Sequence, residues 1–187
     1  MEQRGEQVLA LLWGAGANGK GVLMHVVAQN ALQRRYSGSP QNLGSALFLA
    51  GDATGARAAF EEARRLAPGY ARAHFSLGVL MDASGNDREA IARFTSAVEY
   101  APGMAAARFS LAEALRRTGD LDAAVSHYDQ IIETDPGASQ ARFGRAMALV
   151  RLGRHAAARA ALEEAVSLHA DQPGFPHALA RLLAASP

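Results

Sequence analysis

The chain has 187 residues, 49% of them hydrophobic, and its 19 basic and 18 acidic side chains give a net charge of +1. Because the two signs are interspersed and form no basic stripe for a phosphate backbone, we expect no nucleic-acid partner. The absence of cysteine excludes disulfides and thiolate metal sites, and no apolar run approaches the ~18 residues needed to cross a bilayer.

Residues 1–36 hold an apolar run from Val8 to Trp13, the glycine-rich stretch GAGANGKG and a second apolar-periodic run from Val22 to Leu32. We favour an irregular helical hairpin that turns at Asn18-Gly19. A second interpretation is a phosphate loop, because residues 14–21 satisfy the spacing G-x4-G-K. That motif needs a serine or threonine after its lysine, where this chain has Gly21, and a parallel sheet behind it.

A third interpretation of the same segment is a signal peptide, with Val8–Trp13 as its apolar core and Ala15-Gly16-Ala17 as its cleavage site. The core is short and the first residues are not net positive. We therefore expect a cytoplasmic protein, and a periplasmic one if an export signal has been removed.

From Ser37 onward the sequence repeats with a period of 34 residues. Prolines followed by glycine mark the period at Pro68, Pro102 and Pro136. Within each period, counted from Ala71 as position 1, small residues fall at position 8, glycine at 15, alanine at 20 and a bulky residue at 24. The residues are Gly44, Gly78, Ala112 and Ala146; Gly51, Gly85, Gly119 and Gly153; Ala56, Ala90, Ala124 and Ala158; Phe60, Phe94, Tyr128 and Leu162. A fixed period of this length indicates a repeat protein.

The pattern resembles the tetratricopeptide repeat (TPR), and its tail resembles the segment that follows the repeats in larger bacterial TPR proteins. Each period carries two apolar-periodic runs separated by a glycine turn and closed by Pro-Gly, which predicts a helical hairpin. One hairpin leaves an apolar face bare, so hairpins must stack. The expected fold is all-α, a right-handed α-solenoid of antiparallel helix pairs.

We expect helices near 39–50, 53–66, 70–84, 87–100, 104–118, 121–134, 138–152, 155–169 and 175–185. The expected organisation is a hairpin at 1–36, four repeats at 37–70, 71–104, 105–138 and 139–172, and a capping helix within 173–187. Leu179 and Leu183 should pack this last helix onto the fourth repeat. Ala170 replaces the proline of that repeat, so its second helix should run long, and ends without polar caps would favour a homo-oligomer.

No constellation of residues predicts an enzyme, a cofactor or a metal site. The six histidines show no i, i+4 pairing and no H-E-x-x-H, and there is no G-x-S-x-G. The TPR resemblance implies instead a scaffold that binds a protein or peptide on its concave groove. The Lys/Asn clamp of TPRs that bind chaperone tails is absent, because Gln41, Ser45 and Ser76 stand in its place.

The resemblance also implies which side chains line that groove, chiefly through positions 2, 5, 9, 12 and 13 of each repeat. Position 5 is phenylalanine in three successive repeats, which predicts a ladder of rings rimmed by Arg116, Arg117 and Arg151 and suited to an apolar peptide or amphipathic helix with acidic flanks. The alternative is that the rings serve only as core. The candidate residues are Phe75, Phe109, Phe143, Arg72, Val79, Asp82, Glu113, Arg116, Arg117, Met147, Val150 and Arg151.

Overall fold

A computed structural model describes residues 38–168 and 174–185, all of whose regular elements are α-helices. The chain divides into two compact units, Met1–Pro68 and Gly69–Pro187. The three interpretations of residues 1–36 all concern a segment outside the described residues. Among the helices described, none is long and apolar enough to cross a membrane.

The described part of the first unit is one helical hairpin, α3 (Pro40–Leu49) packed on α4 (Ala53–Leu66). Proline at the first turn of α3 forfeits no helical hydrogen bond, and the Ser39 side chain caps this end by accepting from the Asn42 amide. The two helices cross closely, since a Cβ at Gly44 would lie 2.4 Å from the Phe60 ring. This hairpin is therefore built around a glycine-aromatic crossing.

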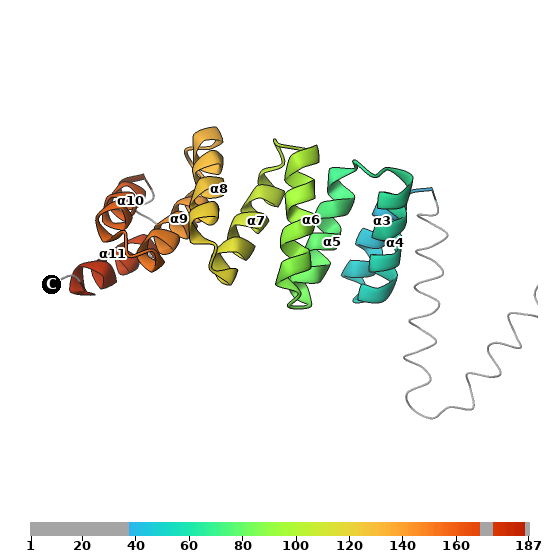
Figure 1. Cartoon of the computed structure of the whole chain (residues 1–187), viewed down its shortest axis with the longest axis horizontal. Helices are drawn as coiled ribbons and strands as arrows, with labels where there is room; N and C mark the ends of the chain where they lie inside the picture. The colour runs from blue at the N-terminus through green and yellow to red at the C-terminus, as the bar shows by residue number, and fades with distance from the viewer. Residues whose placement is uncertain (1–37, 169–173, 186–187) are drawn as a thin grey trace, which may run out of the picture. The chain divides into compact units, whose positions relative to one another are not determined.

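The second unit is a succession of antiparallel helix pairs, in which each helix after the first packs on the one before it (Figure 1). First helices of the pairs contact each other where α7 meets α9, and α9 also meets α11. The helices are α5 (Ala71–Ala83), α6 (Asp87–Tyr100), α7 (Ala105–Thr118), α8 (Leu121–Thr134), α9 (Ser139–Arg151), α10 (His155–Leu168) and α11 (Gly174–Ala185).

The turn inside each hairpin is closed by the same backbone geometry. The glycine at position 15 takes a positive φ, for example +73° at Gly85, a conformation that costs a residue without Cβ nothing. The following amide then bonds back to the last turn of the preceding helix, as from Asn86 N to Met81 O at 2.9 Å. This six-to-one bond satisfies a carbonyl that the helix end would otherwise leave free.

The core of the second unit lies where the two helices of a pair cross. The alanines at position 20 are fully buried at Ala90, Ala124 and Ala158, so nothing larger than a methyl group separates the helices there. Beside them Phe94 and Tyr128 are also fully buried. The small and bulky positions of the 34-residue period thus form the close helix packing for which they were singled out.

These observations confirm the all-α fold class and place the helices predicted from residue 39 onward within one residue of their expected bounds. The tail differs in detail, because Phe175 and Leu182 are the buried residues of α11, whereas Leu183 is 44% exposed and the prediction that it packs inward is wrong. The second helix of the fourth repeat, α10, is described as far as Leu168, and its predicted extension lies in residues 169–173, outside the described part of the chain.

Candidate functional site: a pocket between α7, α9 and α11

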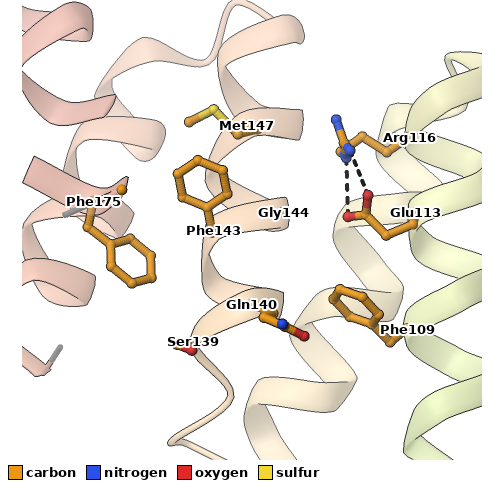
Figure 2. A pocket seen from close by; sticks show the side chains of 10 residues that line it. Phe109, Glu113, Arg116, Ser139, Gln140, Phe143, Gly144, Met147 and Phe175 are labelled. Carbon is orange, nitrogen blue, oxygen red and sulfur yellow. Dashed lines mark hydrogen bonds and ion pairs between the residues drawn. The ribbon is translucent and has the colours of Figure 1, made fainter. Parts of the chain in front are cut away.

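A pocket of about 520 Å³ opens between the first helices of successive pairs (Figure 2). We call it the α7–α9 pocket. Five of its lining residues belong to the predicted groove, and the others come mainly from α9 and from the start of α11. The lining residues are Phe109, Glu113, Arg116, Ser139, Gln140, Phe143, Gly144, Met147, Gly174 and Phe175.

The phenylalanines at position 5 lie with one side against the core and the other toward the groove face. Phe109 packs on buried Tyr128 at 6.2 Å between ring centroids, and Phe143 packs on buried Phe175 at 5.7 Å. Phe143 is 37% exposed, and Phe109 is half-buried. Figure 2 places Phe109 and Phe143 on facing helices, so two rings of the predicted ladder share this pocket.

Phe75, the third predicted ring, lies outside the lining of the α7–α9 pocket. It is half-buried on α5 and packs at 5.9 Å on Phe94, the buried ring of its own hairpin. The position is thus equivalent in packing to that of Phe109 but contributes to a different part of the surface.

An ion pair that also accepts a hydrogen bond from a buried side chain forms one wall of the pocket. Arg116 Nη2 lies 2.6 Å from Glu113 Oε2, and the hydroxyl of buried Tyr128 donates to Glu113 Oε1. Burial raises the pKa of the Glu113 carboxyl, but the hydrogen bonds from Arg116 and Tyr128 and the positive charges of Arg116 and Arg117 outweigh it and hold this pKa below its usual value. Burial, with the hydrogen bond to Glu113, raises the pKa of the Tyr128 hydroxyl. The wall is therefore ionised but internally neutralised.

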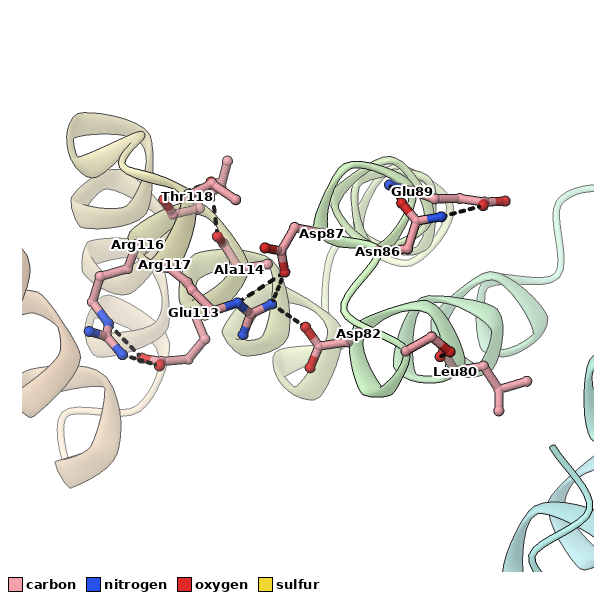
Figure 3. A network of polar contacts seen from close by, with 12 residues as sticks. Leu80, Asp82, Asn86, Asp87, Glu89, Glu113, Ala114, Arg116, Arg117 and Thr118 are labelled. Atoms are coloured by element: carbon pink, nitrogen blue, oxygen red, sulfur yellow. Dashed lines mark hydrogen bonds and ion pairs between the residues drawn. The ribbon is translucent and has the colours of Figure 1, made fainter.

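Arg117 forms a bridge between repeats instead of standing free at the rim (Figure 3). Its guanidinium pairs with Asp82 at the end of α5 and with Asp87 at the start of α6, the latter at 2.6 Å. Hydrogen bonds to Asp87 and Asp82 raise the pKa of the Arg117 guanidinium. Two residues of the predicted groove, Asp82 and Arg117, thus bind each other.

Arg151 reaches across from α9 to α7, where it donates to the backbone carbonyl of Arg116 in the last turn of that helix. Among the described residues no carboxylate pairs with it. A cation at a helix C-terminus is favoured by the helix dipole, but its charge is only partly compensated there. Arg151 is therefore the one arginine of the predicted rim whose charge no described acidic side chain neutralises.

The remaining candidates lie away from the α7–α9 pocket. Arg72 is exposed and Val79 half-buried on α5, while Val150 packs against the core of α9, α10 and α11. The structure thus brings Phe109, Glu113, Arg116, Phe143 and Met147 together, and leaves these three outside their pocket.

Phe175 and Gly144 are among the pocket residues that the sequence analysis did not single out. Phe175 lies 32 residues after Phe143, so a strict 34-residue register places His177 where the ring is needed. Gly144 allows α9 to approach α8, because a Cβ there would lie 2.5 Å from Tyr128 Cζ. A glycine in mid-helix was the available signal for such a close approach.

The described residues contain no cluster of three or more histidine, aspartate or glutamate side chains that could hold a metal ion.

Arg145, which stands where the repeat pattern favours leucine, pairs with Asp129 of α8 at 2.5 Å. The departure from the pattern is thus accommodated by an ion pair between adjacent hairpins.

Two sequence models of the tetratricopeptide repeat match the chain. One matches residues 82–139 and again 116–174, and the other matches residues 47–93. The chain belongs to the tetratricopeptide repeat family. A comparison with curated proteins found no match.

Solved structures with the same fold include several TPR proteins. MamA residues 41 to the end from Desulfovibrio magneticus RS-1 matches with a TM-score of 0.72 at 14% identity, covering 78% of this chain and 82% of that one. YrrB, described as a TPR protein with an unusual peptide-binding site, matches with a TM-score of 0.69 at 22% identity, covering 86% and 88%. TTC0263, described as a thermophilic TPR protein of Thermus thermophilus, matches with a TM-score of 0.55 at 26% identity, covering 78% and 80%. These likenesses concern the fold.

Proposed function

We propose that this protein is a protein-interaction scaffold that binds a peptide or a partner helix in the groove formed by its first helices. The observation that carries the proposal is the α7–α9 pocket, a space of about 520 Å³ lined by Phe109 and by the partly exposed ring of Phe143. Concave, mostly apolar pockets with a few polar groups are typical binding sites. Family membership and the peptide-binding site named for YrrB support the same role.

The pocket is suited to anchoring one apolar side chain of a partner. Aromatic rings offer large contact area, and anchors buried in such pockets tend to dominate binding energy. Met147 adds an adaptable thioether to the wall, and Gln140 offers an amide that can bond to a partner's backbone. The Glu113–Arg116 pair carries no net charge, so an apolar side chain that covers it buries no unpaired charge.

Selection from a displayed library of random twelve-residue peptides tests this function. We expect the whole chain to enrich peptides that bind the wild type and lose about 30-fold or more in affinity for Phe143→Ala, which corresponds to ~2 kcal/mol. The matched control is Leu168→Ala, an apolar residue of α10 that is 54% exposed and lies outside the pocket. Enriched peptides that bind both variants like the wild type, or no enrichment at all, would refute the proposal.

A further inference from the structure

A second pocket of about 500 Å³ continues the first one along α9. It lies between the start of α7, the end of α8 and the start of α9, and it shares Phe109, Ser139 and Gln140 with the α7–α9 pocket. The shared residues join the two pockets into one track. Its lining residues are Ala105, Ala106, Phe109, Ser110, Ile131, Asp135, Gly137, Ala138, Ser139, Gln140 and Ala141.

The track has an acidic group at one end. Asp135 follows α8 and lines the second pocket, where its Oδ1 accepts a hydrogen bond from the Gly137 amide at 2.9 Å. Its side chain is exposed, and no described arginine pairs with it. A cationic group that enters the second pocket therefore meets a carboxylate whose charge is not neutralised by a salt bridge.

The opposite end of the track carries a positive charge. Arg151 is four residues, about one helical turn, beyond Met147 on α9, so it lies on the face of α9 that lines the α7–α9 pocket. It is exposed and bonded to a backbone carbonyl, whereas Arg116 and Arg117 are both engaged by carboxylates. Between the two ends the lining is apolar around Phe143.

We propose that the track recognises a short, extended peptide that has a bulky uncharged side chain in its middle, a basic residue at the Asp135 end and an acidic residue at the Arg151 end. This inference rests on the proposed function and names the ligand of that same site. The 13 residues of α9 span about 20 Å at 1.5 Å per residue. About six extended residues cover that distance at ~3.3 Å each, which sets the separation of the two charged residues.

The test uses the peptides enriched by the whole wild-type chain. We expect their consensus to place a basic and an acidic residue about six positions apart, with a Leu, Ile, Met, Phe or Trp between them. For the best binder, a synthetic peptide with the two charged residues exchanged should bind about tenfold more weakly in a fluorescence-anisotropy titration, since each exposed pair contributes up to ~1 kcal/mol.

Charge-neutralising variants locate the two contacts without disturbing the fold. Asp135→Asn keeps an acceptor for the Gly137 amide, and Arg151→Gln keeps a donor for the Arg116 carbonyl. Each should weaken binding of the selected peptide about threefold to fivefold. A peptide that lacks the matching charge should bind the variant and the wild type equally well. Glu99→Gln and Arg88→Gln remove the same charges from exposed sites on α6 outside both pockets and should change nothing.

The outcomes separate this inference from the function on which it rests. Peptides that depend on Phe143 but lack the charge pattern, or ignore both neutralising variants, would overturn the inference and leave the proposed function intact. If no peptide depends on Phe143, both fail. A peptide whose acidic residue responded to Asp135→Asn, or whose basic residue responded to Arg151→Gln, would also overturn it.

Discussion

The three phenylalanines at position 5 each pack on another buried ring, and they differ in how much of each ring the fold covers. Phe75 is half-buried on Phe94, whereas Phe143 is 37% exposed and packs on Phe175. We expect Phe75→Ala to lower the free energy of unfolding by ~2 kcal/mol and Phe143→Ala by ~1 kcal/mol, both below the ~3–5 kcal/mol typical of a fully buried ring. Urea denaturation of the two variants measures this, and a loss of ~3 kcal/mol or more at Phe143 would mean that this ring is core.

Glu113 makes stability depend on pH. Its folded-state pKa is held below the unfolded value by Arg116 and Tyr128, so its contribution is present above the unfolded pKa of about 4.3 and is lost as pH falls through the folded pKa. Glu113→Gln should therefore lower the free energy of unfolding near pH 7. The difference in this free energy between the variant and the wild type should shrink as the pH falls from about 5 to 3. Urea midpoints measured across this range test the prediction, and parallel curves for the two proteins would contradict it.

At the scale of one helix, the start of α9 is held by a clasp that consists of the two hydrogen bonds of Arg142. Arg142 is 7% exposed; its Nε donates to the Pro136 carbonyl at 3.0 Å and its Nη1 to Glu164 of α10 at 2.8 Å. One repeat earlier, Arg108 likewise donates to the Pro102 carbonyl, at 2.7 Å. The arginine at position 4 thus ties α7 and α9 to the turns that precede them.

Removing the clasp should loosen the start of α9. Arg142→Leu leaves the Pro136 carbonyl without its side-chain donor, and we expect a loss of ~1–3 kcal/mol in the free energy of unfolding. Arg159→Leu is the matched control, because Arg159 is exposed on α10 and its ion pair among the described residues is with Glu163, four residues away. That change should stay within ~0.5 kcal/mol. Equal effects of the two substitutions, measured by urea denaturation, would contradict the role of the clasp.

The helices could be predicted from sequence because residues close to each helix end determine where it stops. Gly85 ends a helix by its positive φ, and Pro102 with Gly103 cannot continue one, so the 34-residue spacing fixes the bounds. The pocket was only partly predictable. Phe175 comes from a tail that leaves the repeat register, so it could be found only once α11 was placed against α9.

The sequence predicted where the charged residues of the groove lie, but not which of them pair with each other. Arginine side chains are long enough to reach partners that are distant in sequence, and Arg117 pairs with acids 30 and 35 residues away. A rim of three free arginines was thus the natural prediction from periodicity, while two of the three are engaged by carboxylates. Which cation stays available depends on side-chain rotamers that the repeat does not encode.

At the scale of the whole Gly69–Pro187 unit, each helix pair packs mainly on its sequence neighbours, so damage to one pair should fade along the array. Gly78→Leu provides the damage, because even a Cβ at this position would lie 2.5 Å from Phe94 Cε1. We expect a cost of ~1–3 kcal/mol or more. Amide hydrogen exchange should show the largest loss of protection in α5 and α6, a smaller loss in α7 and α8, and the least in α9 and α10.

A uniform loss of protection through all of these helices would show that the unit unfolds in a single step. An unchanged exchange pattern would show that the crossing of α5 and α6 accommodates Gly78→Leu, which would contradict the close packing seen there. Gly103→Leu is a suitable comparison, since a Cβ at Gly103 meets nothing within 4 Å and its φ is not positive. It should leave the protection of α5 and α6 unchanged.

The glycine turns make the chain selective for handedness at single positions. At Gly85 the Cβ of an L-residue would meet no neighbouring atom within 4 Å, so the only obstacle to an L side chain is the positive φ of +73°. L-alanine should cost ~1–2 kcal/mol there. D-alanine, the mirror image, prefers this conformation and should stabilise the protein by ~0.4–1 kcal/mol, because it restricts the unfolded chain. Semisynthetic proteins that differ only in the chirality of this one alanine would melt at temperatures on opposite sides of the glycine parent.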